Sequence, residues 1–229
     1  RCHEAGVRCY LMMPRIFRKE AEQYFRKQME LLTSAGFDAL GIGSMEEPGF
    51  LREAGIELPM YFDQGMYSWN HLAGAAMERY GADRLTIPVE LNEREIRDSG
   101  VQGEMIVYGY LPMMISAQCI RKTTLGCSGK SEIMWLKDRK DMRFPVVNQC
   151  RFCYNTIYNS APLSLLGLSE QVTGLKPNAV RLNFTVEEPA AAGEILDAFF
   201  EEYGMSEKAA EPPVLRNQFT RGHFKRGVE

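Results

Sequence analysis

The sequence has few histidines, few tryptophans and no long apolar run. Its 229 residues include three His and two Trp. No two histidines form an H-x-x-x-H pair, which excludes a zincin-type metalloprotease. It has no G-x-S-x-G elbow, no Walker A loop and no G-x-G-x-x-G after a strand, so neither a hydrolase serine site nor a nucleotide site is indicated. No segment approaches the roughly 20 apolar residues that a membrane helix needs.

A secretory signal peptide is also missing from the sequence, and we expect a cytoplasmic protein without membrane contact. The chain begins at Arg1 rather than Met, so we expect it to be a fragment of a longer protein. Its length suits one large domain or two small ones. A hydrophobic content of 45% and a charged content of 25% are ordinary for a globular protein, so a sizeable core can form without cysteine staples.

Cysteine is scarce, but four of the six cysteines lie in one segment. They are Cys119, Cys127, Cys150 and Cys153, and the last two form a C-x-x-C pair. Thiolates are soft ligands that suit zinc or an iron–sulfur cluster, and four of them complete either site. We therefore expect a metal-binding loop here.

Two other interpretations of these four cysteines stay open. Scattered cysteines are often small buried apolar residues, and we expect this of Cys2 and Cys9. A disulfide is disfavoured for the central four because nothing else in the sequence indicates secretion.

The charge is uneven along the chain. Between Cys119 and Cys153 there are eight basic and three acidic residues, a local charge of +5 within a total of −3. More basic residues surround His223 near the C-terminus: Arg216, Arg221, Lys225 and Arg226. Such a surface could face an anion such as RNA, or could simply be solvated.

Strands and helices are expected to alternate along most of the chain. Glycines stop several of the predicted helices, and short apolar runs mark the strands. Strands are predicted at 7–14, 37–43, 58–63, 84–88, 104–110 and 179–185, and helices at 18–36, 45–54, 68–80, 91–98, 164–175 and 189–203. Ser68 is the predicted cap of the helix that ends at Tyr80.

This alternation is typical of βα units with a parallel sheet. The strand spacing favours a partial (β/α) barrel of the TIM type, with an open doubly wound sheet as the alternative. Because six strands are fewer than eight, we expect the first barrel strands to lie upstream and the exposed edge to allow dimerisation. The expected domains are C-terminal barrel units at 1–118, a four-cysteine loop at 119–160, and the last βα elements with a basic tail at 161–229.

Polar residues follow several of the predicted strands, where the chemistry of parallel βα folds is placed. Asp63 and Glu90 could hold a metal or act as acid and base, with Tyr108 as a further catalytic candidate. Each could instead be a cap or turn residue. The other members of the set are Arg15, Asn70 and Asn92.

The segment from Glu104 to Cys119 resembles the signature of the collagenase-like peptidases, peptidase family U32. The likeness continues through Asp138 to Lys140, Phe144-Pro145, the C-x-x-C pair and Tyr154 to Ser160. Residues 220–228 are similar to the end of the family's core domain, and 61–70 and 90–92 fit its strand ends. The resemblance covers nearly the whole chain.

The resemblance implies a (β/α) barrel and a [4Fe–4S] cluster on Cys119, Cys127, Cys150 and Cys153, with zinc as the alternative metal. It implies a protease of unassigned catalytic type acting on peptides. Other family members take part in hydroxylation of RNA bases or of the ubiquinone ring, so an RNA-modifying enzyme is an alternative. The non-enzymatic alternative is a zinc-stapled scaffold domain. The implied partners are the missing N-terminal part of the protein and a peptide or RNA substrate.

Overall fold

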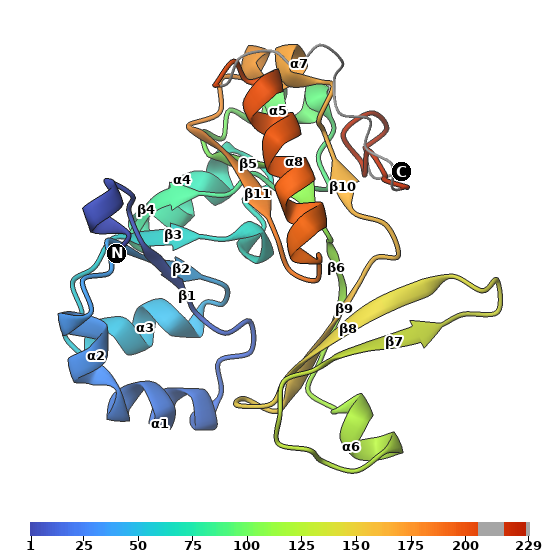
Figure 1. Ribbon diagram of the computed structural model, residues 1–229. Helices are drawn as coiled ribbons and strands as arrows, with labels where there is room; N and C mark the ends of the chain where they lie inside the picture. Colours follow the sequence, from blue (N-terminus) through green and yellow to red (C-terminus); the bar gives the residue numbers. More distant parts are fainter. Residues whose placement is uncertain (206–217, 228–229) are drawn as a thin grey trace. The chain divides into compact units, whose positions relative to one another are not determined.

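The computed structural model describes residues 1–205 and 218–227, apart from the side chain of Leu31. These residues form two compact units (Figure 1). The first unit comprises Arg1–Pro88 and Ile96–Glu104, and the second comprises Val89–Glu95 and Met105–Glu229. Among the described helices, none is both long enough and apolar enough to cross a membrane.

The first unit is built on a four-stranded parallel sheet in the order β1-β2-β3-β4. Helices follow the strands, as expected for βα units. The strands are β1 (Tyr10–Met12), β2 (Ala39–Ile42), β3 (Met60–Phe62) and β4 (Ala82–Leu85), and the helices are η1 (His3–Ala5), α1 (Lys19–Lys27), α2 (Met29–Ser34), α3 (Glu46–Glu53), η2 (Gln64–Met66) and α4 (His71–Arg79). The α/β class with a parallel sheet is therefore confirmed.

The two faces of this sheet differ. Leu40 and Ile42 of β2 and Phe62 of β3 are at most 1% exposed, and they form the apolar face. On the other face the Tyr61 hydroxyl donates to the Tyr10 hydroxyl at 3.3 Å, and the Arg84 guanidinium lies over the Tyr61 ring. A core of strand and helix side chains thus forms on one side, and a polar aromatic layer on the other.

Two predictions for this unit need correction. The helix expected at 18–36 is interrupted at Gln28, which ends α1 with φ −108° and ψ 19°. No glycine or proline marks that position, so the pattern gave no sign of the break. Asn70, not Ser68, caps α4, because its side chain accepts from Ala73 N at 3.0 Å. Ser68 instead donates to the carbonyl of Thr86 at 3.1 Å.

The second unit contains a three-stranded sheet in the order β10-β5-β11. Strand β10 runs antiparallel to β5. The elements of this part are α5 (Glu93–Ser99, whose first residues belong to this unit), β5 (Glu104–Gly109), β10 (Leu163–Ser164), α7 (Ser169–Gly174), β11 (Ala179–Asn183) and α8 (Pro189–Glu202). The helix predicted at 164–175 is wrong in its first part, because Leu163 and Ser164 pair with Gly109 and Tyr108 before α7 begins.

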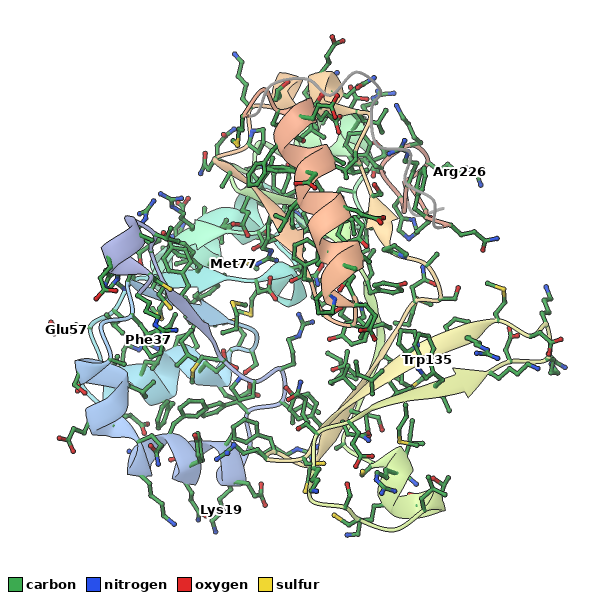
Figure 2. The ribbon with its side chains drawn as sticks, in the orientation of Figure 1. Lys19, Phe37, Glu57, Met77, Trp135 and Arg226 are labelled. Carbon is green, nitrogen blue, oxygen red and sulfur yellow. The ribbon has the colours of Figure 1, made fainter. Side chains whose placement is uncertain are left out.

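A four-stranded antiparallel sheet forms the rest of the second unit, in the order β6-β9-β8-β7. Its strands are β6 (Pro112–Ser116), β7 (Ile133–Lys137), β8 (Arg143–Gln149) and β9 (Tyr154–Tyr158), with α6 (Ile120–Thr124) between β6 and β7. The segment expected to be a loop is therefore largely a sheet. Burial alternates along β7, where Ile133 and Trp135 are exposed, as expected for a strand with one face toward solvent. Figure 2 labels Trp135 on this strand.

Candidate metal centre and strand-end residues

All four central cysteines lie at one end of the antiparallel sheet. Cys119 follows the end of β6, and Cys127 lies between α6 and the start of β7. Cys150 directly follows β8, and Cys153 directly precedes β9. The register places these strand ends together, because Ser116 pairs with Asn155, Gln149 with Tyr154, and Ile133 with Val147. The fold thus gathers residues that are far apart in the sequence.

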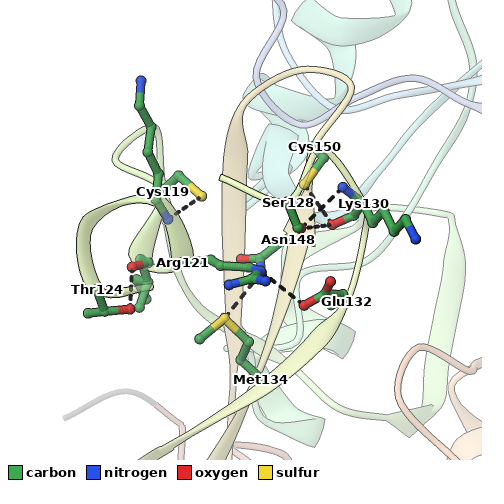
Figure 3. Close-up of polar contacts among 11 residues, drawn as sticks. Cys119, Arg121, Thr124, Ser128, Lys130, Glu132, Met134, Asn148 and Cys150 are labelled. Carbon is green, nitrogen blue, oxygen red and sulfur yellow. Dashed lines mark hydrogen bonds and ion pairs between the residues drawn. The ribbon is translucent and has the colours of Figure 1, made fainter. Parts of the chain in front are cut away.

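Three of the thiols have a polar contact with nearby backbone, and Figure 3 shows those of Cys119 and Cys150. Cys119 is the N-cap of α6, and its Sγ accepts from Lys122 N at 3.4 Å. The Cys150 thiol donates to the carbonyl of Lys130 at 2.9 Å, which joins the end of β8 to the segment before β7. The Cys153 Sγ lies 3.8 Å from the carbonyl of Cys150.

The thiols also interact electrostatically. Burial raises the pKa of the Cys150 thiol, and the neighbouring thiols of Cys119, Cys127 and Cys153 raise it further. Cys153 has a positive φ of 51°, a conformation that is uncommon for residues other than glycine. Such strain often occurs at functional sites, where the surrounding structure maintains it.

These residues suit a metal centre in their chemistry. All four are free cysteines, and thiolates are the ligands that zinc and iron–sulfur clusters prefer. Within residues 1–205 and 218–227, no three Cys, His, Asp or Glu side chains converge closely enough to hold a metal ion. Ligation would therefore require deprotonation of the thiols and a local shift, such as release of the Cys150–Lys130 hydrogen bond.

The other two cysteines differ from their prediction. Cys2 is exposed and Cys9 is partly exposed, so neither is a buried apolar residue. Both lie near the start of the chain, before strand β1, none of whose residues is buried. Burial raises the pKa of Cys9, with a further contribution from Cys2.

The basic residues of the cysteine segment are partly neutralised by ion pairs. Arg121 Nε lies 3.1 Å from the Glu132 carboxylate, and Lys137 lies 2.7 Å from Asp141. Other basic side chains of the segment are exposed: Lys122, Lys130, Arg139, Lys140 and Arg143.

The basic residues near the C-terminus have structural contacts. The Arg221 guanidinium donates to the carbonyls of Ser164 and Leu166 at 2.7 and 2.6 Å, and burial lowers its pKa. His223 Nδ1 lies 2.8 Å from the carbonyl of Gly227. Arg216 lies outside the described residues. Arg221 therefore connects the described residues near the C-terminus to β10 and to the segment that follows it.

Asp63 follows β3 in the first unit and forms an ion pair with Arg15, which follows β1. Arg15 Nη1 donates to Asp63 Oδ2 at 3.2 Å. Gly65 lies against the Arg15 guanidinium, because a Cβ there would come within 2.4 Å of Nη2. The structure thus brings together two polar residues that follow parallel strands of the same sheet.

Glu90 and Tyr108 belong to the second unit. Tyr108 lies near the end of β5 and is 4% exposed. Burial raises its pKa, and the negative charge of the nearby Glu187 carboxylate raises it further. Glu90 Oε2 is buried without a hydrogen-bond partner among the described residues. Asn92 is a helix cap, since it exchanges hydrogen bonds of 2.8 and 2.9 Å with Glu95 at the start of α5.

Two acidic residues with unusual environments were not identified from the sequence. Glu187 lies between β11 and α8 and accepts from the backbone amides of Thr185 and Val186 at 2.6 and 3.0 Å. Glu47 is fully buried, and burial raises its pKa to about 8 although Gly43 N donates to it at 2.8 Å. Glu47 follows the strand predicted at 37–43, and Glu187 follows the strand predicted at 179–185. This position after a strand was the sequence signal that could have identified them as candidate site residues.

Comparison with known proteins places the chain in a family. The sequence model of peptidase family U32 matches residues 1–193. No curated protein matches the chain. A solved structure, the U32 peptidase Mk0906, is similar over 48% of this chain at 15% sequence identity and a TM-score of 0.38. The chain spans 49% of that protein's length. Because the family model matches most of its residues, the chain belongs to peptidase family U32.

Proposed function

We propose that this chain is the metal-carrying part of a collagenase-like U32 peptidase, with a [4Fe–4S] cluster on Cys119, Cys127, Cys150 and Cys153. The observation that carries this proposal is the placement of four free thiols from separate segments at one end of the antiparallel sheet. Four thiolates complete a cluster site. A cluster bound by all four thiolates would supply electron transfer.

We propose further that the parallel strands are part of a (β/α) barrel. Support comes from Thr86, which follows β4 and forms a parallel bridge with Glu104 at the start of β5. Both residues of this bridge belong to the first unit, whose sheet has the order β1-β2-β3-β4. In the first unit, the group proposed to handle protons during peptide cleavage is Asp63, paired with Arg15. In the second unit, the candidates are Tyr108 and Glu90.

Two alternatives have specific support. The exposed basic side chains in the cysteine segment favour an RNA substrate, because they could contact phosphates directly. Arg121, by contrast, is already paired with Glu132. Zinc is supported by the C-x-x-C pair in a hairpin turn, since structural zinc sites use four such ligands. In that case the domain would be a scaffold.

The deciding experiment is metal and acid-labile sulfide analysis of the protein purified without oxygen. We expect about four iron and four sulfide per chain, with absorbance near 400 nm, and neither in a variant with all four cysteines changed to Ser. One colourless zinc per chain would support the scaffold alternative. Absence of both metals from the wild type would contradict the proposal.

The substrate class is tested on the complete protein with gelatin peptides and with RNA. Cleavage of peptides that is lost in Asp63→Asn would support the peptidase. Modification or salt-sensitive retention of RNA without peptide cleavage would support the alternative. The isolated chain with Asp63→Asn serves as the folding control, judged by circular dichroism.

A further inference from the structure

Two buried asparagines lie side by side next to the cysteine end of the sheet. Asn148 on β8 is paired with Asn155 on β9. Their side chains are 1% and 0% exposed. Burying an amide is costly unless it is hydrogen-bonded, so each buried asparagine calls for a structural reason.

Asn155 has contacts that connect two cysteine-bearing segments. Its Nδ2 donates to the carbonyl of Gln118 at 2.6 Å and lies 3.4 Å from the carbonyl of Ser116. Both carbonyls belong to the bend that precedes Cys119, and Asn155 itself lies two residues after Cys153. Because both partners are acceptors, the amide nitrogen must face them. One side chain therefore joins the Cys119 segment to the β8–β9 hairpin.

A second side chain, that of Ser116, also stabilises the bend before Cys119. The Ser116 hydroxyl accepts from Gln118 N at 3.1 Å and lies 3.4 Å from the Gln118 carbonyl. Ser116 is partly exposed, in contrast to Asn155. Together the two side chains fix the direction in which the chain leaves β6, and hence where Cys119 lies at the start of α6.

Asn148 is similarly buried but connects different groups. Its Nδ2 contacts the Met134 thioether at 3.3 Å, a weak acceptor on β7 (Figure 3). Among the described residues, it forms no hydrogen bond with the bend at 116–118. The Oδ1 atoms of both asparagines are buried and have no hydrogen-bond partner among the described residues. Asn148 is thus a matched control for the general cost of disturbing a buried asparagine.

We propose that Asn155 is a positioning residue for the thiol ligands, which holds Cys119 within reach of Cys150 and Cys153. This inference rests on the proposed metal centre. Side chains that orient metal ligands typically contribute about 10–100-fold to metal affinity. Loss of the Asn155 amide would free the bend before Cys119, and the ligand set would have to be assembled at each binding event.

The first test measures Zn²⁺ affinity of the reduced, metal-free chain by competition with a chromophoric chelator. Asn155→Ala is expected to bind Zn²⁺ about 10-fold or more weakly than wild type, and Asn148→Ala within about 3-fold. Ser116→Ala loosens the same bend without opening the core and is expected to fall between them. Equal affinities of wild type and Asn155→Ala, or equal losses in both asparagine variants, would overturn the inference.

A second readout needs no metal. With Cys127 and Cys150 changed to Ser, a short bifunctional thiol reagent is expected to cross-link Cys119 with Cys153. The rate should fall in Asn155→Ala and Ser116→Ala but not in Asn148→Ala. An unchanged rate in Asn155→Ala contradicts the positioning role. If the wild type binds neither zinc nor iron, but the cross-linking rates of the variants follow this pattern, only the proposed metal centre is contradicted.

Discussion

At the scale of single residues, the chemical type of a cysteine suggests a role more directly than the chemical type of an acid does. A thiol carries its ligand chemistry wherever it lies, so Cys119, Cys127, Cys150 and Cys153 could be identified from sequence. Glu47 could not, because it stands beside Glu46 in the helix predicted at 45–54, where the sequence does not show which carboxylate is buried. The fold buries it completely, in the first turn of α3.

Glu47 leads to a prediction for the pH dependence of stability. Burial raises its pKa from the ordinary 4.5 to about 8 in the folded protein. The folded state therefore holds this proton more tightly than the unfolded chain does. The corresponding stabilisation is complete below pH 4.5 and is lost as the pH rises toward about 8. Glu47→Gln cannot ionise, so its free energy of unfolding should rise relative to wild type over this range.

Urea unfolding at pH 5, 7 and 9 measures this difference. Glu46→Gln is the matched control, because Glu46 is the exposed neighbour in the same helix turn. Its difference from wild type should stay nearly constant with pH. Parallel curves for wild type and Glu47→Gln would show that the carboxyl is ionised in the folded protein.

At the scale of elements, strand and helix alternation was predicted where the apolar runs are short and bounded by glycine. Strands β1, β2, β3 and β11 fall inside their predicted ranges. Strands β7, β8 and β9 were missed, since Lys, Arg and Gly residues on and between them resemble a solvated loop. Half of an antiparallel strand can face water, so exposed side chains such as Ile133 and Trp135 do not argue against a strand.

Gly109 gives a prediction about how β5 and β11 pack. It ends β5 with φ +147°, and a Cβ there would come within 2.5 Å of the Asn183 carbonyl oxygen. Because that atom is backbone, Gly109→Ala must displace β11. We expect a loss of about 1–3 kcal/mol in the free energy of unfolding.

The matched control is Gly193→Ala in α8, where a Cβ would meet nothing within 4 Å. Alanine is favoured over glycine inside helices, so this variant should gain up to about 1 kcal/mol. Chemical denaturation of both variants provides the measurement. Similar free energies for the two would contradict the close approach of β5 and β11.

At the scale of the whole molecule, the division into two units predicts which segments a bound metal stabilises. All four thiols belong to the second unit, and the parallel sheet β1–β4 belongs to the first. Binding to the folded state stabilises the structure that holds the ligands. Amide hydrogen exchange should therefore slow on adding Zn²⁺ to the reduced chain in segments 116–133 and 148–155.

The same experiment should leave exchange in β1–β4 unchanged. The variant with four serines serves as the control for weak surface binding of zinc. Slower exchange throughout the first unit would mean that the two units unfold together, and no change anywhere would contradict the metal centre.

The sequence by itself determined the α/β class and the parallel βα order of the first unit, and it indicated which thiols to propose as ligands. These follow from local periodicity, glycine stops and side-chain chemistry, which neighbouring residues carry. Only the tertiary structure decided that the cysteine segment is a sheet, that its four thiols share one end, and that Asn155 joins their segments. Register, burial and the meeting of distant strands arise from long-range pairing, so no local pattern could show them.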